Sequence, residues 1–112
     1  LAHKKNIGFR QQGRLVGYLE LIESYPERDH ILTGFFIIEK AVQSRGLGSA
    51  IINSVLAEYA ASDFKIAILS HASTDEKAKA FWQKNRFVAT GEIDDCDDIQ
   101  LVVMERNLVA SA

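Results

Sequence analysis

Apolar residues first occur along the chain in short runs that predict β-strands. Residues 15–22 form a nearly continuous apolar run rich in β-formers, and a weaker strand is expected at residues 7–10. Residues 11–13 between them are typical of a hairpin turn. Residues 24–29 hold the only proline and predict a second turn. Residues 31–38 predict a third strand that is apolar on both faces, so we expect it in the centre of a sheet with both sides covered.

The hydrophobic pattern changes to a helical period after Gly46. Six apolar residues recur at spacings that predict an amphipathic helix, namely Leu47, Ile51, Ile52, Val55, Leu56 and Tyr59. Residues 74–85 predict a second helix, with Ala78, Phe81 and Trp82 on its apolar face.

The remaining elements follow from capping residues and short apolar runs. Ser73 or Thr74 is expected to cap the second helix, because two acidic residues follow in the first turn. A short buried strand is expected at residues 64–69, and the last two strands at residues 87–93 and 99–105. The acidic stretch between these last two strands is expected to be a turn.

The resulting order of elements is β-β-β-α-β-α-β-β. It mixes hairpins with one β-α-β crossover. This combination predicts an α/β fold in the broad sense, namely an α+β mixed sheet with helices packed against it. A chain of 112 residues fits one such domain, spanning residues 1–112.

Composition narrows the classes of function. A formal net charge of −2 argues against a nucleic-acid binder, which would need a basic surface. The single cysteine, Cys96, cannot form an internal disulfide. No apolar run approaches the roughly 18 residues of a membrane span, and no signal peptide is evident. We therefore expect a cytoplasmic protein without a membrane partner.

No metal is expected either. The three histidines and Cys96 lack the spacing of metal ligands. The acidic residues at 94–98 lack the pattern of a calcium-binding EF-hand loop.

The segment Gln43-Ser44-Arg45-Gly46-Leu47-Gly48-Ser49 has the features of an anion site. It opens a helix, whose first backbone N–H groups have no internal partners and whose dipole favours negative charge. Its glycines allow a phosphate to approach the backbone closely, and Arg45 can add a charge-assisted hydrogen bond. A glycine-containing turn without a ligand is the alternative.

Two common glycine-rich loops do not match this segment. The dinucleotide fingerprint requires a third glycine where Ile51 stands, and the ATP-type P-loop requires Gly-Lys-Ser/Thr, which is absent. The remaining pattern, Gln-x-x-Gly-x-Gly, resembles motif A of the GNAT superfamily of N-acetyltransferases.

A second likeness to this family lies downstream. Its members often carry Asn-x-x-Ala-x-x-Leu/Phe-Tyr-x-Lys/Arg-x-Gly-Phe, and residues 75–87 resemble that motif. The positions in register are Ala78, Phe81, Lys84 and Phe87. The order of elements also matches the family from its second strand to its last, so the resemblance covers nearly the whole chain.

The resemblance implies a GNAT-like acyl-CoA N-acyltransferase fold with acetyl-CoA as co-substrate. The strand at residues 31–38 should splay away from the strand at residues 64–69, with the pantetheine arm in the gap. The arm would pair with main-chain groups near Phe36, Ile37 and Ile38. The pyrophosphate would lie on the amides of Gln43, Ser44, Arg45, Gly46, Leu47, Gly48 and Ser49. Contacts to the coenzyme are also implied for Asp75, Phe81 and Trp82. Lys79 and Lys84 are candidates for contacts to its outer phosphates, with solvated charges on the helix as the alternative.

The chain departs from the family pattern at three positions. Trp82 replaces a tyrosine that in many relatives protonates the departing thiolate. An indole does not release its proton near neutral pH, so we expect Trp82 to serve as wall and core. A free thiol has a pKa of about 8.5, so a thiolate can leave unaided. Asp75 replaces the usual asparagine and can still cap a helix. Arg86 replaces the usual glycine, which predicts that its turn needs no positive φ.

The general base is open between several candidates. Histone-type members place a glutamate where this chain has Leu32. Glu20 lies in an otherwise apolar strand, where a carboxylate can be tuned to accept a proton. His71 is expected where the two central strands diverge, and His30 and a water relay are further alternatives. The backbone amide of Ile38 would polarise the thioester carbonyl as an oxyanion-hole donor does.

The sequence therefore predicts a bacterial-like N-acetyltransferase that moves an acetyl group from acetyl-CoA to a primary amine of a small molecule or protein. A non-catalytic acyl-CoA-binding or regulatory module of the same fold and an interaction domain with an empty loop are the alternatives. A homodimer is an open question. The family usually has an earlier strand and two helices that form part of the acceptor wall. We therefore expect the natural protein to be longer, or a partner subunit to cover this gap.

Overall fold

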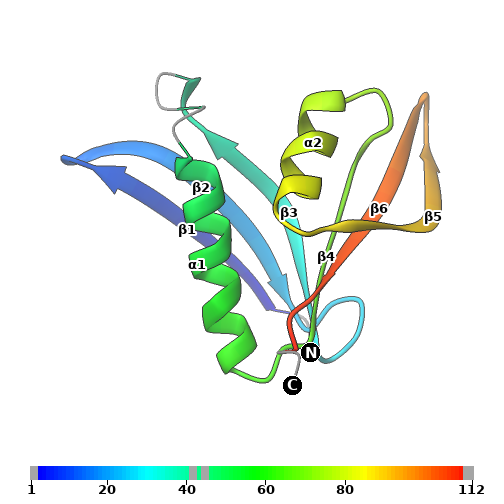
Figure 1. Ribbon diagram of the computed structural model, residues 1–112, viewed down its shortest axis with the longest axis horizontal. Coiled ribbons are helices and arrows are strands. Elements are labelled where there is room, and N and C mark those ends of the chain that lie inside the picture. Colours follow the sequence, from blue (N-terminus) through cyan, green and yellow to red (C-terminus); the bar gives the residue numbers. More distant parts are fainter. Residues whose placement is uncertain (1–2, 41–42, 44–45, 110–112) are drawn as a thin grey trace.

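The computed structural model describes residues 3–40, 43 and 46–109 and has the order of elements that the sequence predicts (Figure 1). The elements are β1 (His3–Gln11), β2 (Arg14–Glu23), β3 (His30–Ile38), α1 (Leu47–Ala61), β4 (Ile66–Ala72), α2 (Glu76–Lys84), β5 (Val88–Cys96) and β6 (Ile99–Asn107). The strands form one six-stranded sheet in the order β1-β2-β3-β4-β6-β5. Within the described chain, only β3 and β4 pair in parallel. The predicted mixed sheet is confirmed.

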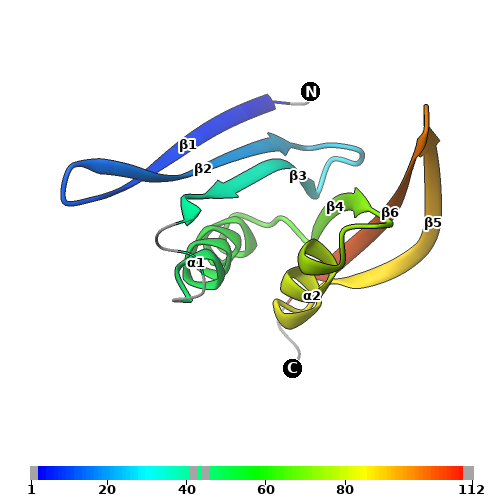
Figure 2. The ribbon, with the colours of Figure 1, turned by 90° about the horizontal axis from the view of Figure 1, so that it is seen from above.

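Both helices lie on the same face of the sheet (Figure 2). The core between them and the sheet consists of Leu19, Leu21, Ile31, Ile51, Ile52, Val55, Leu56, Ala67, Leu69, Trp82, Phe87 and Met104. Full burial of one large apolar side chain stabilises a fold by about 1.5–3 kcal/mol. This core therefore fixes α1 and α2 against the central strands that flank the candidate site.

The opposite face of the sheet carries exposed apolar residues on β3. Phe35 and Ile37 are 48% and 51% exposed. Successive side chains of a strand point to opposite faces, so Phe36 and Ile38 pack against the helix-side core instead. The expectation that both sides of this strand are covered is wrong for the described chain, because both helices lie on one face.

The N-terminus of α2 is capped by its own sequence. The Oδ1 atom of Asp75 accepts a hydrogen bond from the backbone N–H of Ala78 at 3.0 Å. The cap is therefore Asp75 and not Ser73 or Thr74, and the helix begins at Glu76, two residues later than predicted. The prediction that Asp75 retains a capping role is confirmed.

The C-terminus of α2 ends in a left-handed turn at Arg86, whose φ is 70°. The N–H of Arg86 donates to the carbonyl of Gln83, and the N–H of Phe87 donates to the carbonyl of Trp82, each at 3.0 Å. These two bonds define a Schellman motif, which usually has glycine at the left-handed position. The prediction that this turn needs no positive φ is wrong, because the hydrogen bonds impose that conformation on an arginine.

The hairpin between β5 and β6 is tighter than the sequence predicts. β5 extends to Cys96, which pairs with Ile99, so the acidic stretch is partly strand and its turn is limited to Asp97 and Asp98. In the described part of the chain, neither helix is long and apolar enough to cross a membrane.

Candidate active site

The central strands β3 and β4 separate soon after they begin. Their parallel pairing is limited to His30 with Ile66, Ile31 with Ala67 and Leu32 with Ile68. Beyond these pairs, β3 continues to Ile38 and β4 to Ala72 without pairing with each other, while β3 still pairs with β2 and β4 with β6. Figure 1 shows the two strands diverging as a V, with α1 beside one arm and α2 beside the other. The splay that the family resemblance implies is therefore present. The space between the diverging edges of β3 and β4 is called the opening below.

The N-terminus of α1 lies beside the open end of this V. Gly46 is its N-cap residue, with φ 77°, and no side chain among the described residues caps the helix. The first turn carries no acidic residue, and the first helical hydrogen bond runs from the N–H of Ala50 to the carbonyl of Gly46 at 3.0 Å. The amides of Leu47, Gly48 and Ser49 are thus the unpaired donors that open a helix. Such an end attracts an anion, in contrast to α2, which is capped by a carboxylate.

Glycine is favoured at the two positions of the loop for different physical reasons. An added Cβ at Gly46 would meet no described atom within 4 Å, so its positive φ is what favours glycine. An added Cβ at Gly48 would lie 3.2 Å from Cε1 of Phe81. Gly48 therefore leaves room for Phe81, which approaches α1 closely from α2. Gln43 supports the loop, since its Nε2 donates to the carbonyl of Ile38 at 2.7 Å. Ser44 and Arg45 lie outside the described residues.

Aromatic residues of α2 line the helix side of the opening. Phe36 of β3 lies with its ring centroid 6.1 Å from those of both Phe81 and Trp82. Trp82 also contacts Phe87, at 5.2 Å, and is only 8% exposed. Trp82 is thus mainly a core residue, which confirms the core part of its expected role; its role as a wall of the coenzyme site stays a prediction.

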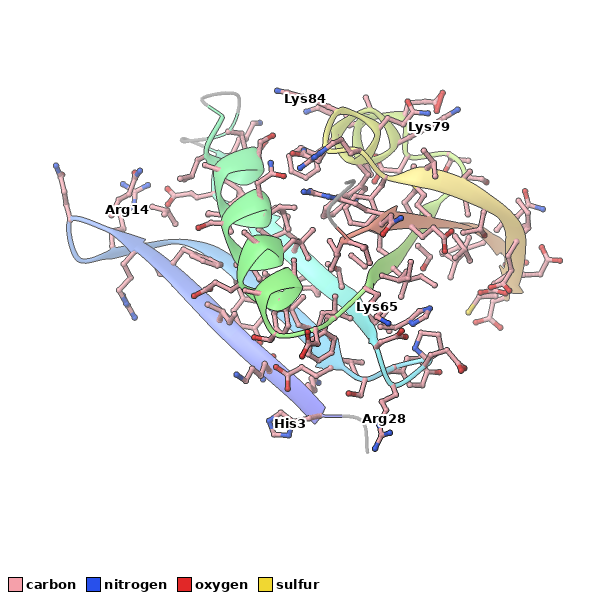
Figure 3. All side chains as sticks on the ribbon, turned by 60° about the horizontal axis from the view of Figure 1, so that its bottom comes forward. His3, Arg14, Arg28, Lys65, Lys79 and Lys84 are labelled. Carbon is pink, nitrogen blue, oxygen red and sulfur yellow. The ribbon has the colours of Figure 1, made fainter. Side chains whose placement is uncertain are left out.

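The two candidate lysines of α2 lie on different sides of the helix. Lys84 is close to one turn beyond Phe81, which contacts α1, whereas Lys79 is on nearly the opposite side of the helix. Figure 3 shows Lys84 on the side of α2 that is nearer to α1 and Lys79 on the side away from it. Lys84 can therefore contribute positive charge near the N-terminus of α1, and Lys79 is poorly placed to do so.

The free edge of β3 presents backbone groups to the opening. The N–H of Glu39 donates to the carbonyl of Val16 on β2 at 2.8 Å. Backbone groups of successive residues point to alternate edges, so the N–H and carbonyl of Ile38 point away from β2, towards the opening. The side chain of Ile38 contacts the first turn of α1, since its Cγ1 is 3.7 Å from a Cβ built on Gly48. Ile38 thus lies between the opening and the N-terminus of α1.

His71 lies on the part of β4 that pairs with β6 but no longer with β3. It follows the buried residue Leu69 on the helix side of the sheet by two positions and is 7% exposed. Its Nδ1 is 2.8 Å from the carbonyl oxygen of Ala72. A carbonyl can only accept, so Nδ1 carries the proton, and the Nε2 of the neutral ring is the basic nitrogen.

Glu20 lies on the opposite face of the sheet. It alternates with the core residues Leu19 and Leu21, and it pairs across β2 and β3 with the exposed Phe35. Its Oε2 forms an ion pair with Nζ of Lys4 at 3.0 Å. Its Oε1 would be 2.6 Å from a Cβ at Gly34, so this glycine makes room for the carboxylate.

The structure therefore brings His71 to the helix side of the opening, with the N-terminus of α1, and leaves Glu20 on the other face. The third candidate, His30, lies where β3 and β4 are still paired, and its Nδ1 is 2.9 Å from Oδ1 of Asp29. The hydrogen bond to His30 is the main reason that the pKa of Asp29 is lowered.

A hollow of about 650 Å³ lies at this paired end of the sheet. It is lined by Glu27, Arg28, Asp29, Ser62, Asp63, Phe64 and Lys65. Figure 3 shows Arg28 and Lys65 at this end, far from Lys84. The hollow contains none of the predicted site residues. No group of three or more potential metal ligands occurs in the described part of the chain.

Sequence reasoning missed a buried polar cluster behind the loop, formed by Asn53, Asn85 and Arg106. Asn85 and Arg106 are 4% and 8% exposed. A polar residue within an apolar helix or strand pattern is a weak signal of such a cluster. The sequence does not show which of these residues bond to each other, because the bonded pairs are 21 to 53 residues apart.

The chain matches known proteins in sequence and in fold. The sequence profile of the acetyltransferase (GNAT) domain matches residues 2–108. No curated protein matches the chain in sequence. Among solved structures, the ribosomal-protein-S18-alanine N-acetyltransferase from Escherichia coli is 15% identical with a TM-score of 0.80, over 97% of this chain and 72% of that one.

Two further structures share the fold. An aminoglycoside 6'-N-acetyltransferase complexed with coenzyme A is 14% identical with a TM-score of 0.80, over 97% of this chain and 75% of that one. A spermidine N-acetyltransferase chimera derived in part from Vibrio cholerae is 20% identical with a TM-score of 0.78, over 94% of this chain and 69% of that one. Identities this low show the fold alone, whereas the profile covers almost the whole chain. The chain therefore belongs to the GNAT family of acetyltransferase domains.

Proposed function

We propose that the chain transfers an acetyl group from acetyl-CoA to a primary amine by direct attack. The observation that carries this proposal is the opening between β3 and β4 after three residue pairs, beside the uncapped N-terminus of α1. An extended pantetheine arm fits an unpaired strand edge, and a pyrophosphate fits a set of unpaired helical amides. The solved relative that is complexed with coenzyme A supports the choice of coenzyme.

The residues of this chain fit the coenzyme at both ends. In the proposal, main-chain groups of Phe36 and Ile38 pair with the pantetheine arm, because they point away from β2, whereas those of Ile37 between them point towards β2. The amides of Leu47, Gly48 and Ser49 hold the pyrophosphate, and Lys84 adds positive charge. An added Cβ at Gly46 would meet no described atom within 4 Å, so nothing in the described part of the chain fills the space beside this glycine. Asp75 already has a structural role as helix cap, so we assign it only a wall role here.

The reaction needs an acceptor for one proton. A neutral amine attacks the thioester carbonyl, the C–S bond breaks, and the coenzyme leaves as a thiolate. In the proposal, the amide of Ile38 polarises the carbonyl oxygen. His71 is our preferred base because Nε2 is its basic nitrogen and lies on the helix side of the opening. Glu20 remains the candidate for an amine that arrives from the other face.

Trp82 favours a second candidate function. It stands where many relatives have a tyrosine acid, it is largely buried, and its indole cannot supply a proton near neutral pH. A chain of this kind that binds acyl-CoA without transferring the acyl group would serve as a binding or regulatory module. Turnover of an amine separates the two functions.

The first experiment measures thermal unfolding with and without acetyl-CoA. A ligand at about 100 times its dissociation constant adds about 2.7 kcal/mol to the free energy of unfolding. For a domain of this size that corresponds to a rise of roughly 10 °C in Tm. No change in Tm at millimolar acetyl-CoA would contradict both the enzyme and the module.

The second experiment measures release of coenzyme thiol across a panel of primary amines. The His71→Gln variant is expected to lower kcat by about a hundredfold or more, as loss of a general base does, while Glu20→Gln serves as the competing test. A larger loss in Glu20→Gln would assign the base to the other face. Coenzyme binding without turnover of any amine would favour the module.

The acceptor class stays as broad as the sequence predicts. The solved relatives are named for a ribosomal protein, spermidine and an aminoglycoside, which supports amines of either small molecules or proteins as substrates of this chain. A cytoplasmic location and a homodimer remain predictions.

A further inference from the structure

A buried polar network connects the first turn of α1 to the C-terminal end of α2. Nδ2 of Asn85 donates to Oγ of Ser49 at 3.1 Å and to the carbonyl of Phe81 at 2.9 Å. Oδ1 of Asn85 accepts from Nδ2 of Asn53 at 2.9 Å, and the same Nδ2 donates to the carbonyl of Ser49 at 2.8 Å. The Phe81 carbonyl can only accept, so it fixes which way the Asn85 amide points.

Arg106 closes the network from β6. Its Nη1 donates to Oδ1 of Asn53 at 2.7 Å and to the backbone carbonyl of Asn85 at 3.3 Å. Burial, and then the nearby charge of Arg86, lower the pKa of Arg106. No described carboxylate forms an ion pair with Arg106. Its charge instead lies at the C-terminal end of α2, where the helix dipole is negative.

The orientation of Asn85 has a consequence for the hydroxyl group of Ser49. A hydroxyl that accepts a hydrogen bond still has its own proton to donate. Among the described residues, none accepts that proton. Ser49 is the third residue of α1, so its hydroxyl is a further donor beside the three amides that open the helix.

We propose that Asn85 is a positioning residue for the coenzyme pyrophosphate, acting through the hydroxyl of Ser49. This inference rests on the proposed function. Asn85 occupies one lone pair of Oγ and so directs the Ser49 proton towards an anion at the end of α1. Arg106 and Asn53 hold Asn85 in this orientation. The network thus links the phosphate-binding end of α1 to the wall formed by α2.

The test uses the substitutions Asn85→Asp and Ser49→Ala. An aspartate cannot donate to Oγ of Ser49, so the Ser49 hydroxyl donates to the carboxylate instead and turns away from the anion. The new carboxylate also lies near the Arg106 charge, which limits the loss of stability. Ser49→Ala removes the hydroxyl alone. Ser54→Ala, at an exposed position of α1, is the matched control.

We expect both variants to weaken coenzyme A binding about tenfold or more, as loss of a hydrogen bond to a charged group does. In calorimetric titrations the double variant should bind no more weakly than Ser49→Ala, because the two residues act as one unit. In amine acetylation, KM for acetyl-CoA should rise while kcat at saturation stays unchanged. Ser54→Ala should match the wild type.

A shortened acetyl donor distinguishes the positioning role from a purely structural role. S-acetylpantetheine lacks the pyrophosphate, so its KM should be the same for wild type and both variants. An equal loss with this donor would overturn the inference, as would wild-type coenzyme affinity in Ser49→Ala. If the wild type itself does not bind coenzyme A, the proposed function fails. If the wild type binds and the variants bind equally well, only the positioning role fails.

Discussion

Replacing Gly46 with alanine tests whether the N-terminus of α1 holds the coenzyme, and Gly13 provides a matched control. The two glycines have φ values of 77° and 80°, and an added Cβ at either would meet no described atom within 4 Å. An alanine in the left-handed region costs about 1–2 kcal/mol. Restriction of the unfolded chain returns about 0.4–1 kcal/mol. Each variant should therefore lose about 0.5–1 kcal/mol of stability, which lowers Tm by about 2–4 °C.

The two variants should differ in coenzyme binding. Gly46 sets the direction of the first amides of α1, so an alanine there displaces donors that the pyrophosphate needs. We expect Gly46→Ala to weaken coenzyme A about tenfold, or about 1.4 kcal/mol. Gly13 lies in the β1–β2 hairpin, and Gly13→Ala should bind as the wild type does. Thermal unfolding and calorimetric titration check the two effects separately. Equal affinity in the two variants would refute the assignment of α1, and an unchanged Tm in Gly46→Ala would refute the strained cap.

Three further substitutions test the packing and the electrostatics. Trp82→Ala should lower the free energy of unfolding by about 3–5 kcal/mol, because it empties a buried aromatic site; a urea midpoint close to that of the wild type would contradict the core role. Arg86→Gly should raise Tm by about 2–4 °C, because it relieves a left-handed arginine, and a decrease would show that the arginine side chain matters more than its backbone. Burial, and then the hydrogen bond to Glu23, raise the pKa of Tyr59. Its contribution to stability is therefore present below about pH 10, where an unfolded tyrosine begins to ionise, and is lost at higher pH. Tyr59→Phe should lessen the fall in Tm above about pH 10. A fall as steep as in the wild type would show that ionisation of Tyr59 is not its cause.

The sequence by itself determined the order of the elements, the mixed sheet and the glycine-containing loop that opens α1. Each of these depends on signals within about ten residues, such as the change from apolar runs to a helical period after Gly46. Even so, the local sequence gave wrong predictions for two features of α2. Asp75 and not its neighbours forms the cap, and Arg86 takes a conformation that its residue type does not suggest.

Only the tertiary structure decided which residues of the candidate site lie together. The alternation of a strand shows that Glu20 and its neighbours point to different faces, but the side that α1 and α2 cover depends on the whole sheet. That choice places His71 on the helix side of the opening and Glu20 on the other face. The role of Gly48 also appeared only in three dimensions, because Phe81 reaches it from another helix.

The buried network shows most clearly what local sequence patterns cannot predict. Asn53, Asn85 and Arg106 lie on α1, at the end of α2 and on β6, and no local pattern connects them. Hydrogen bonds between distant elements form only after apolar burial has brought those elements into place. The sequence therefore specifies the loop that is suited to bind an anion, and the packing of the sheet and helices determines which side chains orient it.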